Sequence, residues 1–144
     1  MTYPKAALAL FCSLTLCASA YAQSAHTPKP GSEERATIMD AIREPAEKEL
    51  KQSVIFKVDQ LRVAGEWAYA KVSPTRPDGG ELNYSKTKFQ KQIDLGAFDP
   101  QGEALLFKEE DGQWAVVEWV FGSTDVPSAG WSSKHPGIPK SVLQ

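Results

Sequence analysis

The first periodic segment of the chain predicts an α-helix that begins after Ser32. Apolar residues recur every four positions, which places them in one stripe on a helix. Ser32 is a typical N-cap, since its hydroxyl accepts hydrogen bonds from the first turn. Pro45 either kinks this helix or begins a second one, and we favour one bent helix packed on a sheet. The stripe consists of Ile38, Ile42, Ala46 and Leu50.

Between residues 54 and 72 the apolar period changes to two, which predicts a β-hairpin. The parity of the apolar positions changes near Asp59 and Gln60, and such a slip indicates a β-bulge. Ala64-Gly65-Glu66 predicts the turn, and residues 67–72 return as the partner strand. Residues 73–80 hold two prolines and two glycines and are predicted to be a loop.

A second hairpin is predicted between residues 104 and 121. Asp111-Gly112 separates two apolar runs there and predicts a two-residue turn with positive φ. That turn would pair Phe107 with Val116. Both faces of the two strands are apolar near their middle, so we expect them to be covered on both sides and to lie inside the sheet.

These elements predict the α+β class. The bent N-terminal helix packs on a curved antiparallel sheet of about four strands, formed by the two hairpins. A short inserted helix is expected at about residues 85–95, and a helical tail is expected to pack on the domain through Trp131 and Ile138. Residues 32–144 then form one domain. Residues 23–31 contain two prolines and no large apolar residue, which predicts a flexible leader.

Residues 1–22 have the layout of a secretory signal peptide. Lys5 precedes an apolar run, and Ala20-Tyr21-Ala22 provides the small-residue cleavage site, so we expect cleavage near Ala22. The run is too short to span a membrane, which takes about 20 residues. A lipoprotein attached through Cys17 is disfavoured because Leu16 precedes it, where lipoprotein signals usually carry a small residue.

Loss of this segment would change the chemistry available to the chain. Removing 22 of the 144 residues leaves 122, and the loss of Lys5 changes the net charge from −2 to −3. Both cysteines, Cys12 and Cys17, would be lost, which excludes disulfides, thiolate catalysis and cysteine-ligated zinc from the exported domain. The absence of disulfides from an exported domain favours a location in the bacterial periplasm. We expect no stable membrane span in the exported domain. The acidic balance disfavours a nucleic-acid partner.

The order of helices and hairpins resembles that of the superfamily of nuclear transport factor two and ketosteroid isomerase, whose curved sheet folds into a cone. The segments 105–108 and 111–117 carry that resemblance. The cone superfamily has further long strands beyond the point where this chain reaches Gly122. The chain is also similar to small uncharacterised exported proteins of Gram-negative bacteria. The shared features are Gly65 with Trp67, and the segments 96–99, 111–117 and 122–126 followed by Trp131.

Three side chains are candidates for acid–base catalysis: Asp59 beside the predicted bulge, Tyr69 on the partner strand and Glu118 within an apolar strand. The cone resemblance implies a carboxylate, tyrosine or histidine in a cavity as the catalytic group. Burial of such a carboxylate would raise its pKa. The alternatives are that Asp59 satisfies the bulge backbone or pairs with Arg62, and that Glu118 points to solvent.

His26 and His135 are the only histidines, and no metal-ligand motif surrounds either, so we expect no metal and no other cofactor. The sequence also lacks the motifs of serine hydrolases, P-loop nucleotide hydrolases and zinc proteases. An enzyme of those three classes is therefore disfavoured.

Tryptophans provide the candidate binding residues, Trp67, Trp119 and Trp131. Exposed rings would bind a glycan or a protein, unless the tail covers them. Trp114 and Trp119 differ in strand parity, which predicts that they lie on opposite faces of the sheet.

The leading hypothesis is a periplasmic non-enzymatic binding or accessory protein that recognises an envelope protein or a wall-derived glycan. One alternative is a small cone-fold enzyme, an isomerase or hydro-lyase that uses a buried carboxylate. The other alternative is an inhibitor or immunity protein against a basic wall-degrading enzyme, which the acidic balance would suit.

Overall fold

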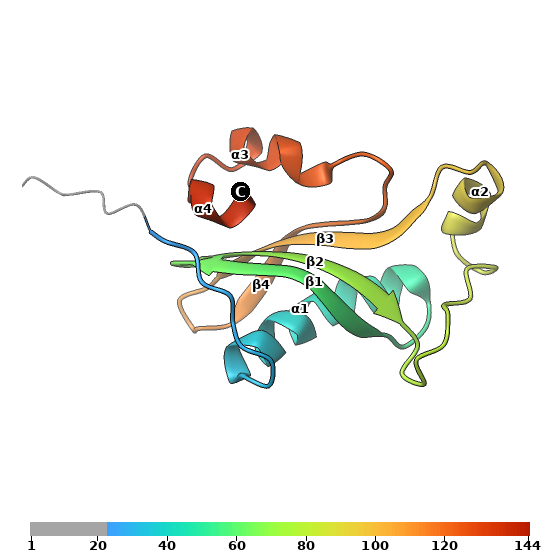
Figure 1. Cartoon of the computed structure of the whole chain (residues 1–144), viewed down its shortest axis with the longest axis horizontal. Coiled ribbons are helices and arrows are strands. Elements are labelled where there is room, and N and C mark those ends of the chain that lie inside the picture. Colours follow the sequence, from blue (N-terminus) through green and yellow to red (C-terminus); the bar gives the residue numbers. More distant parts are fainter. Residues whose placement is uncertain (1–22) are drawn as a thin grey trace, which may run out of the picture.

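The computed structural model describes residues 23–144 and has the predicted α+β fold, with one long helix and a curved, unclosed antiparallel sheet (Figure 1). The signal peptide predicted for residues 1–22 lies outside the described residues. The elements are α1 (Glu33–Leu50), β1 (Ile55–Ala64), β2 (Trp67–Thr75), α2 (Phe89–Asp94), β3 (Asp99–Lys108), β4 (Trp114–Gly122), η1 (Pro127–Gly130), α3 (Trp131–Lys134) and α4 (Lys140–Leu143).

Helix α1 begins and continues as its sequence predicts. The Ser32 hydroxyl accepts a hydrogen bond from the backbone N–H of Arg35 at 3.3 Å, which caps the first turn. The helix continues through Pro45 as a single element, which agrees with the one-helix interpretation. Its apolar stripe is buried: Ile38, Ile42, Ala46 and Leu50 are each fully inaccessible to solvent.

The first hairpin agrees with the sequence prediction except at its end. Residues 73–75, predicted to lie in a loop, continue β2 because they pair with residues 55–57 of β1. Strands β1 and β2 pair antiparallel, with a bulge between Val58 and Gln60 at the predicted position. Ala64 pairs with Trp67 across a two-residue turn, and Gly65 has a φ of 57° at the first turn position. Glycine adopts this conformation readily because it has no Cβ.

The turn of the second hairpin differs from the prediction. The N–H of Gly112 donates a hydrogen bond to the carbonyl of Glu109 at 2.9 Å. The N–H of Glu109 donates to the carbonyl of Gln113, also at 2.9 Å, so residues 110–112 form a three-residue loop. Phe107 therefore pairs with Ala115, one position from the predicted partner. The prediction of a two-residue turn was wrong. Gly112 has the positive φ that was predicted, 82°, but it occupies the bulge position at the end of a three-residue loop.

A bulge in β4 then changes the parity of the strand. The register shifts between Leu105 and Leu106, so that Leu106 pairs with Val116 and Leu105 with Glu118. Val117 is the extra residue. As a result, the buried Trp114 and the partly buried Trp119 pack in the same cluster with α1.

Two predictions about β4 are therefore wrong. Trp114 and Trp119 do not lie on opposite faces, because the bulge lets both indoles pack toward α1. Strand β4 also lies at the edge of the sheet, whose order is β1-β2-β3-β4. The expected cover on both faces of its hairpin is nevertheless present, since α1 packs on one side and the tail on the other (Figure 1).

The two faces of the sheet have separate cores. The helix face packs against α1, while the tail face is partly covered by η1, α3 and α4 (Figure 1). The predicted packing of the tail through Trp131 and Ile138 is confirmed, because both side chains are buried in the tail-face core with Tyr69 and Leu105. A third cluster lies at the α2 end and includes Phe89. Across residues 23–144, no helix is both long and apolar enough to cross a membrane.

Residues 23–31, predicted to be a flexible leader, are attached to the domain by specific hydrogen bonds. The N–H of His26 donates to the carbonyl of Val63 at 2.8 Å, and the N–H of Val63 donates back to His26 at 2.9 Å. The Ser141 hydroxyl donates to the carbonyl of Gln23 at 2.6 Å. Val63 lies on the outer edge of β1, where backbone groups lack a neighbouring strand, so the leader satisfies part of that edge.

Candidate functional site

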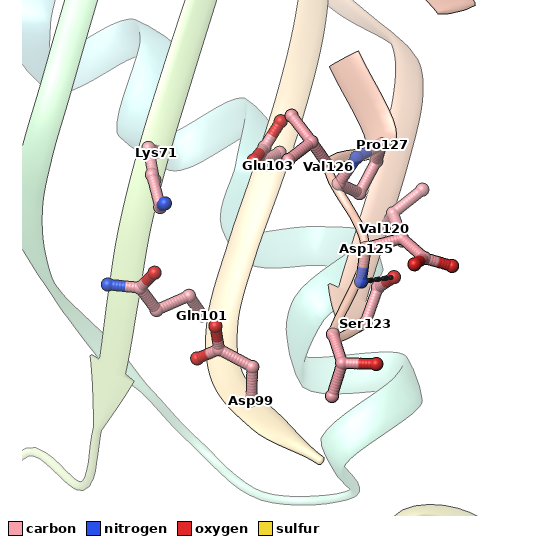
Figure 2. Close-up of a pocket in the computed structure, with 10 residues that line it drawn as sticks. Lys71, Asp99, Gln101, Glu103, Val120, Ser123, Asp125, Val126 and Pro127 are labelled. Carbon is pink, nitrogen blue, oxygen red and sulfur yellow. Dashed lines mark hydrogen bonds between the residues drawn. The ribbon is translucent and has the colours of Figure 1, made fainter. Parts of the chain in front are cut away.

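A polar pocket of about 170 Å³ lies on the tail face of the sheet, beside the loop that follows β4 (Figure 2). Strand β2 contributes one cation and strand β3 contributes two carboxylates and an amide. The loop contributes hydroxyls, a carboxylate and an apolar wall. The lining residues are Lys71, Asp99, Gln101, Glu103, Val120, Ser123, Thr124, Asp125, Val126 and Pro127.

Strand register and one turn assemble this pocket. Lys71 on β2 lies directly opposite Glu103 on β3, and Gln101 lies two positions before Glu103 on the same strand. Gly122 ends β4 with a φ of 80°, a left-handed conformation that suits glycine and redirects the chain into the loop. Within the loop, the N–H of Asp125 donates to the Ser123 hydroxyl at 3.2 Å. Figure 2 shows this bond, with the loop on one side of the pocket and Lys71 on the other.

The charges of the pocket are not paired with one another. Within residues 23–144 no ion pair joins Lys71 to Asp99, Glu103 or Asp125, although three carboxylates and one ammonium line the same space. Over the same range, no three acidic, histidine or cysteine side chains form a group that could hold a metal ion. The ammonium of Lys71 and the carboxylates of Asp99 and Asp125 are therefore available to a polar ligand.

Glu103 differs from the other carboxylates because it is buried, with 7% of its surface exposed. The N–H of Ser128 donates to its Oε2 at 3.2 Å, which links β3 to the start of the tail. Its neighbour Tyr69 has a pKa raised to about 12, chiefly by burial and further by the negative charge of Glu103. Tyr69 is therefore protonated at neutral pH and does not act as a base there.

Glu118, the second acid–base candidate, connects β4 to the tail. Its Oε1 lies 2.8 Å from Nε2 of His135 and forms an ion pair with Lys134. The hydrogen bond from Lys134 and then that from His135 lower the pKa of Glu118 below its ordinary value, and they outweigh the opposite effect of burial. The expected raised pKa is therefore wrong for Glu118, because the tail provides donors to it.

The lowered pKa of Glu118 predicts a pH-dependent loss of stability. The folded pKa lies below the ordinary value of 4.5, so the stabilisation is present above 4.5 and is lost as the pH falls through the folded pKa. We expect Glu118→Gln to lower the free energy of unfolding at neutral pH by about 1 kcal/mol. The difference from the wild type should shrink in urea titrations at acidic pH. A difference that stays constant down to the acid end would contradict the role of this carboxylate.

Asp59, the third candidate, occupies the bulge of β1. Its Oδ2 accepts a hydrogen bond from the Ser73 hydroxyl at 2.6 Å, and Lys57 lies 3.8 Å from its other oxygen. Arg62 does not pair with it and donates instead to the carbonyl of Val142 at 2.9 Å. Since β1 and β4 are opposite edges of the sheet, Asp59 and Glu118 do not form one site.

The three candidate binding tryptophans do not form one site, because two lie on the tail face and the third lies on the helix face. Trp67 and the buried Trp131 are on the tail face, where Trp67 contacts the rings of Phe107 and His135. Trp119 is on the helix face and donates its indole N–H to Oε2 of Glu49 at 2.8 Å. None of the three lines the polar pocket.

The residues that line the pocket were not predicted as a site from the sequence. Asp99, Gln101 and Glu103 alternate along β3, and that polar alternation is the signal that could have marked them. Residues 99–102 instead have the composition of a turn. Lys71 and the loop at 123–127 are separated from them in sequence, so only the register of the sheet unites them.

Comparison with known proteins assigns no family to the chain. No protein-family model, curated protein sequence or solved structure matches it.

Proposed function

We propose that this chain is an exported, non-enzymatic binding protein of the periplasm that recognises wall-derived glycan fragments in the polar pocket. The observation that carries the proposal is the set of unpaired charges in one small pocket, namely Lys71, Asp99 and Asp125. Polar groups that converge in a pocket can fix the orientation of a bound ligand. Export is supported by the signal-like residues 1–22 and by the confinement of both cysteines to that segment.

The size of the pocket favours a small wall fragment, and not a protein, as its ligand. A stable protein interface covers about 800 Å² on each partner and has an apolar centre. The pocket here is small and mainly polar. Fragments of the cell wall present hydroxyl, amide and carboxylate groups, which match the hydrogen-bonding groups of Gln101, Ser123 and Thr124.

The positions of the candidate acids favour binding over turnover. A general acid or base must lie within hydrogen-bond reach of the proton that it transfers. Tyr69 and Glu118 do not line the pocket, and each is engaged in structural contacts on the tail face. Asp59 lies on the far edge strand. These positions support a ligand-binding role for the pocket.

The proposal is tested by adding a muramidase digest of purified sacculi to the ¹⁵N-labelled chain that starts at Gln23. We expect backbone amide shifts at Lys71, Gln101 and residues 123–126, and no comparable shifts along the solvent side of α1. Asp125→Asn should weaken these shifts, because Asp125 is exposed in the pocket and can be changed without disturbing a core.

The matched control is Asp94→Asn, which changes an exposed carboxylate on α2 outside the pocket. It should bind the digest as the wild type does. Absence of shifts, or shifts of equal size in Asp125→Asn, would overturn the proposal. An envelope protein bound at another surface would then become the better hypothesis.

A further inference from the structure

We propose that the pocket selects short zwitterionic peptides, with the free carboxylate bound by Lys71 and the free ammonium bound by Asp99. This inference goes beyond the proposed function, because a wall peptide that is still attached to glycan has its amino terminus in an amide bond, whereas the ligand proposed here is a free peptide.

Opposite charges lie at the two ends of the pocket floor. Lys71 projects from β2, Asp99 lies at the start of β3, and Gln101 lies between them (Figure 2). The two charged groups do not pair, although they line the same pocket. A ligand with one charge of each sign can therefore satisfy both at once, and the Gln101 amide can bond a peptide group between them.

Of the two remaining carboxylates, Asp125 strengthens this polarity and Glu103 is engaged by the backbone. The carboxylate of Glu103 accepts a hydrogen bond from the N–H of Ser128 and forms no ion pair with Lys71, although the two residues lie opposite each other. Asp125 is exposed on the loop side of the pocket. Its charge adds to that of Asp99 and favours a ligand ammonium over a neutral amide.

The register indicates the length of the ligand. Lys71 pairs with Glu103, which lies four positions after Asp99 on β3. Four strand residues span about 13 Å, and the bulge between Asp99 and Gly102 together with the reach of the lysine side chain shortens the gap between the charges. An extended tripeptide spans about 10 Å, so its two ends fit this distance better than those of a single amino acid.

The loop wall favours small apolar side chains on the ligand. Val126 is 66% exposed at the pocket, and Val120 and Pro127 continue the same wall. Contact with this wall removes apolar surface from water without requiring a deep cavity. Trialanine therefore has the charges, length and side chains that the pocket predicts.

The test compares three probes by isothermal titration: trialanine, its N-acetyl derivative and its C-terminal amide. We expect trialanine to bind at least about tenfold more tightly than either blocked peptide, since each blocked peptide loses one charge-assisted contact. Lys71→Gln should abolish the preference for trialanine over its C-terminal amide and keep the preference for trialanine over the N-acetyl peptide. Asp99→Asn should abolish the preference over the N-acetyl peptide and keep the preference over the amide.

Lys91→Gln and Asp94→Asn are the matched controls, since both change exposed charges on α2 away from the pocket. Both should retain the full selectivity for trialanine. Equal affinities for the three probes, or no binding of any, would overturn this inference. If the sacculus digest still shifts the pocket amides in that case, the proposed function stands. Selective binding of trialanine without binding of the digest would instead overturn the wall-derived ligand and leave the preference for a zwitterionic peptide standing.

Discussion

Replacement of Trp131 by alanine is expected to lower the free energy of unfolding by about 3–5 kcal/mol. Trp131 is 5% exposed and packs edge-on against the ring of Tyr69, with ring centroids 6.2 Å apart. Its removal would leave a void between the tail and the sheet, next to Leu105. The measurement is the urea midpoint of the wild type and the variant, with the slope checked for a change in cooperativity.

Trp131→Phe provides a second variant that retains part of the packing and should lose clearly less stability. The sequence predicted Trp131 as a binding residue, and the same pair of variants tests that hypothesis. If Trp131→Ala unfolded at the wild-type midpoint, the packing of the tail on the sheet through Trp131 would be wrong. An exposed binding role would then be favoured.

Gly102→Ala is expected to lower the free energy of unfolding by about 1–3 kcal/mol, through overpacking of the helix-face core. A Cβ at this position would overlap Cη2 of Trp119 and lie 2.7 Å from its Cζ3. The indole has little room to withdraw, because its N–H is bonded to Glu49 and its ring stacks on Phe121 at a centroid distance of 6.2 Å. Urea unfolding measures the loss.

Gly137→Ala is the matched control, since no atom lies within 4 Å of a Cβ built there and its φ is not positive. It should change stability by less than about 0.5 kcal/mol. A double-mutant cycle with Trp119→Leu should recover part of the Gly102→Ala loss, because the smaller side chain leaves space for the methyl group. Strictly additive losses would show that the indole is not the cause.

Several elements were predictable because their signals are local. The Ser32 cap and the four-residue stripe of α1 lie within one continuous segment, and so do the bulge near Asp59 and the Gly65 turn. Each depends on residues that are close in sequence. Helix propensity, side-chain parity and glycine conformation therefore suffice to place them.

The register of the second hairpin could not be predicted from neighbouring residues alone. Its Asp111-Gly112 pair is compatible with both a two-residue and a three-residue loop, and the two differ by one position of register. The Val117 bulge then reverses the parity of the strand. Burial of both Trp114 and Trp119 against α1 accompanies this arrangement, and α1 lies more than sixty residues earlier in the chain.

The pocket and the tail contacts depend still more on tertiary structure. Lys71, Asp99 and Asp125 come from three separate segments, and Glu118 owes its lowered pKa to Lys134 and His135 of the tail. The amino-acid pattern alone was sufficient for the α+β class, helix α1 and the first hairpin, because those follow from neighbouring residues. The register of β4, the covered tryptophans and the charges gathered beside Gly122 were decided only when distant segments packed together, because side-chain contacts across the sheet determine them.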